Sequence, residues 1–202
     1  MPSQTIRILA ATALVVLCAG AALAQPAAER IAGVVDSFDG HVLTVQSGRL
    51  GAVKVNLADD TTVLGMRKAT VSDIKPNDYV GVGAVPLPDG RQRAVLVTIF
   101  AESQRGVGEG HYPWESHPDN TMTNGAVDET VQSVVGQNII VKYKGGEQKI
   151  VVPADAEIRA YVPGDKSGLK PGTHVAIPRA VKQTDGSFAA NRVNVGLGDM
   201  VP

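Results

Sequence analysis

Two halves of the sequence repeat each other, and this internal repeat restricts the fold more than any other feature. An offset of 95 residues places Val80 on Val175, and an offset of 96 residues places Val97 on Val193. The turns and apolar runs around these positions keep their order in both copies, which chance matches of Val with Ile do not explain. A period of this length corresponds to a domain, so we predict a duplicated domain and not a solenoid of small repeats.

Each copy has the pattern of a set of short β-strands. Apolar and polar residues alternate in short runs bounded by Gly, Pro, Asn and Asp, and helical periodicity is nearly absent after residue 24. In the first copy the expected strands are Ile31–Phe38, Val42–Gln46, Val53–Leu57, Tyr79–Val85 and Arg93–Phe100. Five short strands, with the longest loop after the third, are typical of an OB-like small Greek-key barrel. An SH3-like barrel is the alternative.

The predicted domains follow the order of the two copies. Residues 1–24 are expected to be a signal peptide, residues 29–101 the first barrel, residues 102–124 a connector and residues 125–198 the second barrel. The sequence thus predicts an all-β protein of two tandem five-stranded OB-like barrels, joined by a connector that contains aromatic residues and His. A barrel of about 70 residues buries only about 60% of its unfolded surface, so contacts between the barrels are expected to add stability.

Short motifs recur at matching places in both copies. A D-G turn lies in the last hairpin of each, at Asp89-Gly90 and Asp185-Gly186, and an [IL]-K-P motif precedes each fourth strand, at Ile74-Lys75-Pro76 and Leu169-Lys170-Pro171. These motifs resemble a family of exported bacterial domains of unknown function, which often occur in tandem and have an OB-like small barrel. The resemblance brings no catalytic residues. The second copy departs from it by having Glu129 where the first copy has Gly33.

The first 24 residues have the features of a secretory signal peptide. Arg7 gives a weak positive start, Ile8 to Ala21 is apolar, and Ala22-Leu23-Ala24 is a cleavage signal before Gln25. The apolar run is short for a membrane span, so a retained anchor is the less favoured alternative. We therefore expect a periplasmic or secreted protein with no integral membrane span after cleavage.

Cysteine and charge content narrow the function further. Cys18 is the only cysteine, and Leu17 precedes it where a lipoprotein needs a small residue, so lipidation is not expected. The chain has 19 basic and 20 acidic residues and no basic run. This balance argues against binding to nucleic acid and against docking on an anionic membrane surface. Another periplasmic or envelope protein is the partner class left open.

The stretch from Gly106 to Gly125 stands out in an aromatic-poor chain. It holds the only Trp, a Tyr and two of the four His, at Trp114, Tyr112, His111 and His117. One hypothesis is a ligand or partner surface formed by these four side chains. The favoured hypothesis is a structural clasp, in which Trp114 is mostly buried in the seam between the barrels and its indole N–H donates to a carbonyl.

A metal site is a further hypothesis for the same stretch. His111, His117 and Met122 are residue types that bind copper or zinc. However, Pro residues interrupt their spacing, and no established metal motif such as H-E-x-x-H occurs. Two exposed loop histidines are the favoured interpretation, so no metal and no other cofactor is expected.

Established catalytic motifs are missing from the sequence. No G-x-S-x-G elbow and no P-loop occurs, and the acidic residues that recur at matching places, Asp60 and Asp155, are typical of turns. An OB-like face that binds single-stranded nucleic acid also needs stacking aromatics, and the second and third strands offer only Tyr143. We therefore predict a non-enzymatic periplasmic binding protein or envelope-associated scaffold, with an unrecognised hydrolase as the alternative.

The leader predicts the mature N-terminus. We expect the exported protein to start at Gln25, because Ala22 and Ala24 are the small residues that signal peptidase requires. N-terminal sequencing of the exported protein tests this. A chain that starts at Met1, or at a lipid-bearing Cys18, contradicts the prediction.

Overall fold

The computed structural model describes residues 28–114, 117–133 and 136–202, and the fold in this part of the chain is all-β, as predicted. The helical elements among these residues are short 3-10 turns, namely η1 (Val71–Asp73), η2 (Glu102–Gln104) and η3 (Lys166–Gly168). None of them is long and apolar enough to cross a bilayer. The predicted signal peptide, residues 1–24, lies outside the described residues.

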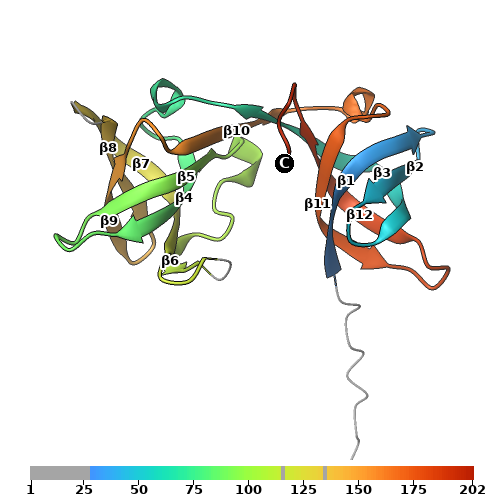
Figure 1. Ribbon diagram of the computed structural model, residues 1–202, viewed down its shortest axis with the longest axis horizontal. Helices are drawn as coiled ribbons and strands as arrows, with labels where there is room; N and C mark the ends of the chain where they lie inside the picture. The colour runs from blue at the N-terminus through green and yellow to red at the C-terminus, as the bar shows by residue number, and fades with distance from the viewer. Residues whose placement is uncertain (1–27, 115–116, 134–135) are drawn as a thin grey trace, which may run out of the picture.

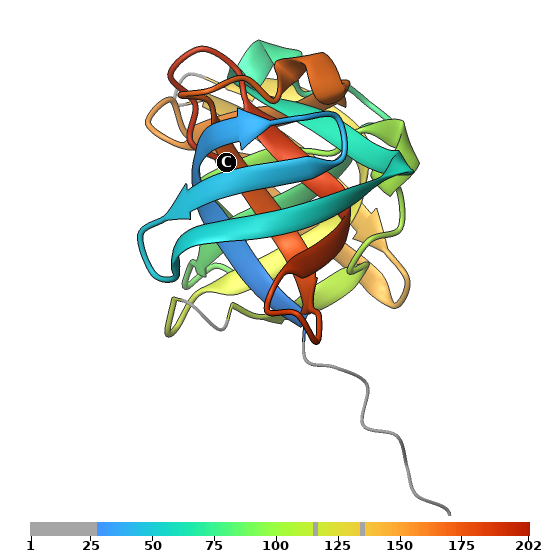
Figure 2. The same ribbon diagram turned by 90° about the vertical axis from the view of Figure 1, so that its right-hand side faces the viewer.

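Five strands close into a first ring. They are β1 (Ala28–Phe38), β2 (Val42–Ser47), β3 (Gly51–Lys68), β11 (His174–Lys182) and β12 (Phe188–Gly196). The pairing order is β12–β11–β1–β2–β3, and a parallel pairing of β12 with β3 closes the barrel (Figure 2). Val53, Val55 and Leu57 of β3 are buried while Lys54 and Asn56 are exposed, as their alternation predicts.

Five other strands form a second ring. They are β4 (Tyr79–Pro86), β5 (Gln92–Ile99), β7 (Thr121–Ser133), β8 (Gly136–Tyr143) and β9 (Gly146–Val152). Their order is β5–β4–β7–β8–β9, and the parallel pairing of Gln92 and Arg93 with Ile150 and Val151 joins the two ends. The short β6 (Gly110–Pro113) pairs with β7 beside this ring. Figure 1 shows the rings as two lobes joined by β3 and by β10 (Glu157–Pro163).

The rings do not follow the predicted domain boundaries of 29–101 and 125–198. Each ring takes three strands from one copy and two from the other, so β4 and β5 enter the second ring and β11 and β12 enter the first. The reason is the path of β3, which continues as one strand to Lys68 and carries the chain out of the first ring. The strands were predicted, but the consecutive assignment to barrels was wrong.

The crossing point of β3 and β10 is internally symmetric. The two strands pair antiparallel with Met66 opposite Tyr161, and the repeat offset of 95 residues maps Met66 onto Tyr161 itself. Leu64 pairs with Pro163 at one end of the crossing, and its own counterpart Arg159 pairs with Lys68 at the other. Equivalent segments thus pair about a local two-fold axis, which is the geometry of reciprocal strand exchange.

Backbone hydrogen bonds flank the crossing in matched pairs. The amide of Ala69 donates to the Ile158 carbonyl at 2.9 Å, and the amide of Gly164 donates to the Val63 carbonyl at 3.2 Å. The repeat offset of 95 residues maps Ala69 onto Gly164 and Val63 onto Ile158, so the two bonds are equivalent. The two rings are therefore joined through main-chain hydrogen bonds as well as through side-chain packing.

The register predicted between the copies holds in the cores. Val80, Val97, Val175 and Val193 are all buried, the first two in the second ring and the other two in the first. Val80 pairs with Ile99, and the matching pair in the first ring is Val175 with Val195. The two copies thus contribute the same residues to their rings in the same register.

The predicted match of Glu129 with Gly33 was wrong. Gly33 pairs with Val175 and Gly125 pairs with Val80, so Gly125 is the counterpart of Gly33. A Cβ on either glycine would clash with the carbonyl of the next strand, and both positions therefore require Gly. The offset is 92 residues in this first strand, because Gly125 and Ile139 are 14 residues apart whereas Gly33 and Leu43 are 10 apart.

The strand exchange predicts how the protein responds to a cut. We expect a chain cleaved after folding, at a protease site added in the exposed segment 106–108, to remain one body, because each ring contains strands from both fragments. Native size-exclusion chromatography should show the fragments eluting together, and denaturant should separate them. Two folded fragments that separate without denaturant would instead support consecutive barrels.

Candidate functional site

The connector residues expected to form a binding surface lie on two faces. In β6 and β7, His111 pairs with Thr123 and Tyr112 pairs with Met122, so strand alternation turns His111 and Tyr112 to opposite sides. His111 Nδ1 lies 2.9 Å from the hydroxyl of Thr123, and burial lowers the pKa of His111. The Tyr112 hydroxyl accepts a hydrogen bond from Asn124 at 3.1 Å.

Trp114 packs on the outer face of the second ring. It is half-buried, and a Cβ at Gly83 of β4 would overlap its ring. His117 stacks on Trp114, and the centroids of the two rings are 3.9 Å apart. Close to the crossing, Phe100 and Tyr161 stack at 6.0 Å instead. The expected place of Trp114 in the seam between the barrels stays a prediction, and its contact with Gly83 is within the second ring.

The candidate metal ligands His111 and His117 contact different aromatic residues. His117 stacks on Trp114, whereas His111 stacks on Tyr143 on the other side of the β6–β7 pair. Across residues 28–114, 117–133 and 136–202, no cluster of three or more His, Asp or Glu side chains has the spacing of a metal site.

A groove with a volume of about 840 Å³ opens on the first ring. It is lined by His41, Asn56, Leu57, Ala58, Arg179, Val181, Ala189, Ala190, Asn191 and Arg192. These residues come from the β1–β2 turn, from β3 and from β11 and β12. Strand exchange therefore brings residues of both copies into one groove.

The groove lies where two ladders of the barrel are interrupted. On one side of β12, Leu57 pairs with Ala190 and the next pair is Thr62 with Arg192, so residues 58–61 bulge opposite Asn191. On the other side, the pairing of β11 with β12 is interrupted between residues 176 and 181. Backbone polar groups near Asn191 are thereby released from regular pairing and can serve a ligand or solvent.

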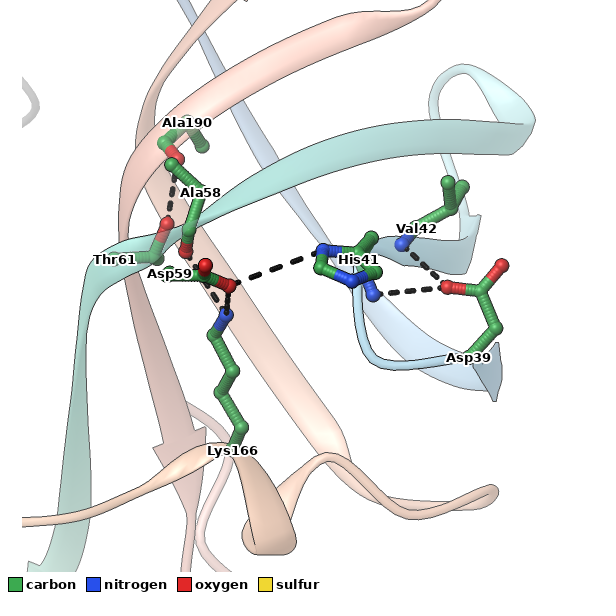
Figure 3. A network of polar contacts seen from close by, with 8 residues as sticks. All are labelled: Asp39, His41, Val42, Ala58, Asp59, Thr61, Lys166 and Ala190. Carbon is green, nitrogen blue, oxygen red and sulfur yellow. Dashed lines mark hydrogen bonds and ion pairs between the residues drawn. The ribbon is translucent and has the colours of Figure 1, made fainter.

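Asp39 fixes the turn that carries His41 (Figure 3). The Oδ1 atom of Asp39 accepts hydrogen bonds from the amides of His41 at 2.9 Å and Val42 at 2.7 Å. These two bonds hold the pKa of Asp39 below its usual value. The turn thus presents His41 at the edge of the groove.

Asp59 lies between His41 and Lys166 beside the groove (Figure 3). Its Oδ1 atom is 3.9 Å from both His41 Nδ1 and Lys166 Nζ. Lys166 also donates a 2.9 Å hydrogen bond to the carbonyl of Ala58, and Thr61 donates one of 3.3 Å to the carbonyl of Ala190. These bonds hold the bulge in place at both ends.

The second ring does not repeat this polar lining. Its counterparts of His41, Asn56, Arg179 and Arg192, by the repeat offsets of 95 and 96, are Gln137, Val151, Ala84 and Leu96. Of these, Gln137 and Ala84 are buried. At the matching break, Arg93 forms a 2.9 Å ion pair with Asp155. The groove is therefore specific to the first ring.

Comparisons of the chain with protein-family models, characterised proteins and solved structures find no match in any of the three.

No motif of the sequence marks this groove. A turn role was predicted for Asp60, the neighbour of Asp59, and neither His41 nor the two arginines were singled out. A signal was present, because the two copies differ in charge at positions that the repeat equates. That difference marks a site only once β12 is known to lie beside β3.

The capped turn predicts a pH-dependent loss of stability. Since the pKa of Asp39 is lowered in the folded state, its contribution is present above its unfolded pKa, near 3.8, and is lost as pH falls through the lower folded value. Replacing Asp39 by Ala should lower the free energy of unfolding at neutral pH. Urea unfolding of wild type and variant should show this difference shrinking below about pH 4. Asp36→Ala, at an exposed position of β1, is the control. A difference in unfolding free energy between wild type and Asp39→Ala that stays constant with pH contradicts the capping role.

Proposed function

We propose that this protein is a non-enzymatic, exported binding protein, periplasmic or envelope-associated, that holds its ligand in the groove of the first ring. The observation that carries the proposal is the groove itself, in which two interrupted ladders meet a lining of imidazole, amide and guanidinium groups. Ligand sites are concave and combine apolar walls with a few placed polar groups.

The strand order supports an OB-like barrel for each ring. In the first ring the order is β1–β2–β3–β12–β11, with the last strand of the sequence parallel to the third, and the second ring repeats it as β7–β8–β9–β5–β4. OB folds bind ligands with their second and third strands and with the loops after the first and fourth. The groove lies between the β1–β2 turn and β12, close to that region.

The lining favours binding over bond cleavage. The ten lining residues provide cationic groups and amides but no hydroxyl, thiol or carboxylate side chain. Asp59 is the carboxylate that lies beside His41 of the lining, and its side chain is 92% exposed while that of His41 is 75% exposed. A general acid–base pair normally needs burial to adjust its pKa values, which this exposed pair lacks.

A bulky side chain in the groove tests the proposal. Ala58 is exposed and lines the groove, so Ala58→Trp should fill it without disturbing the core. The control is Ala154→Trp, at the exposed turn after β9 in the second ring. Wild type and Ala154→Trp should retain a small molecule from an envelope extract, detected by mass spectrometry after dialysis, and Ala58→Trp should not. Equal retention by Ala58→Trp, or no retention by the wild type, counts against the groove.

A further inference from the structure

Two arginines of the groove differ from the other arginines of the described residues. Five arginines form ion pairs with carboxylates, namely Arg49, Arg67, Arg91, Arg93 and Arg105. Arg30 and Arg159 donate hydrogen bonds to the Pro202 carbonyl and to the Thr98 hydroxyl. Within the described ranges, only Arg179 and Arg192 have neither kind of partner, and both line the groove.

The two acidic residues of the 58–61 bulge, Asp59 and Asp60, form no ion pair with these arginines. Asp59 lies at the rim beside His41 and Lys166, and its ion-pair distances are to those two groups. Arg179 and Arg192 therefore bring two cationic groups without a carboxylate partner to the groove lining. A guanidinium presents donors in a planar fork that matches a carboxylate or a phosphate.

The uncharged residues that line the groove restrict the chemistry of the rest of the ligand. Ala58, Ala189 and Ala190 line the groove with small apolar groups, and none of the lining residues is aromatic. Recognition of a nucleobase relies on aromatic stacking, so this lining does not favour a nucleotide. The Asn191 amide adds a donor and an acceptor that suit hydroxyl groups, and so does the Asn56 amide, whose Nδ2 also donates to the Ser187 hydroxyl at 3.0 Å.

We propose that the groove binds a non-aromatic, hydroxylated ligand that carries an anionic oxygen group, such as a sugar acid or a sugar phosphate, held by Arg179 and Arg192. This inference rests on the proposed binding function and names its ligand class. Five other arginines of the protein pair with a carboxylate of the chain. For Arg179 and Arg192, the anionic group of the ligand takes that place.

Probes with and without an anionic group test whether the ligand must be charged. The probes are trigalacturonic acid, its neutral methyl ester and glucose 6-phosphate, with affinities from calorimetry and with the Nε–H signals of arginine followed by NMR. We expect at least one anionic probe to bind and to shift the Arg179 and Arg192 signals. The methyl ester should bind about tenfold or more weakly, because it loses charge-assisted hydrogen bonds.

Substitutions locate the binding. Arg179→Gln and Arg192→Gln should each weaken binding of the anionic probe by about tenfold or more, and Arg192→Lys should restore only part of it. Arg91→Gln, in the hairpin of the second ring, removes a cation that is already paired with Asp89 and should leave binding unchanged. Equal thermal melts of the variants show that they are folded.

The outcomes distinguish a sugar acid from a sugar phosphate. They also distinguish a wrong ligand class from a wrong binding site. Binding of only the uronate indicates a sugar acid, and binding of only glucose 6-phosphate indicates a sugar phosphate. Ester binding as tight as acid binding, retained affinity in both Gln variants, or no shift of the arginine signals at the highest soluble concentration overturns the anionic assignment. If Ala58→Trp then still abolishes ester binding, the groove remains the binding site and only the ligand class is wrong.

Discussion

The antiparallel pairing of β3 with β10 determines how the rest of the protein is assembled. Because Met66 and Tyr161 are equivalent residues and pair with each other, each strand leaves one ring and leads into the other. Neither ring is then complete with strands of one copy. The stacking of Phe100 on Tyr161 adds an aromatic contact beside this crossing. The rings are joined by a shared piece of sheet, which is a stiffer link than a flexible connector.

The sequence predicted the strands and the core register but not the exchange, and the reason is physical. In the second ring Val97 pairs with Ile158, and in the first ring Val193 pairs with Val63. Consecutive barrels would pair Val97 with Val63 and Val193 with Ile158, which are the same kinds of contact. Alternation and turn motifs report which face of a strand is buried, and they carry no information on which copy covers it.

The groove was missed in the sequence for a related reason. Aromatic residues and His drew attention to the connector, but alternation along β6 separates His111 from Tyr112, and Gly83 provides the seat for Trp114. The groove instead combines His41 with Arg179 and Arg192, which are distant in sequence and belong to different copies. Such a site follows from topology, so the strand pairing had to be known before the residues could be grouped.

Duplication with exchange also links ligand binding to the closure of one ring. The groove lies on the parallel pair of β3 and β12, the pair that closes the first ring and joins strands of the two copies. A ligand held there contacts both copies and binds only when the ring is closed, so its binding energy adds to the stability of the closed form. The second ring has the same strand order, but the Arg93–Asp155 ion pair spans its matching break. Under the proposed binding function, an ion pair spans this break in the second ring and a ligand site occupies it in the first.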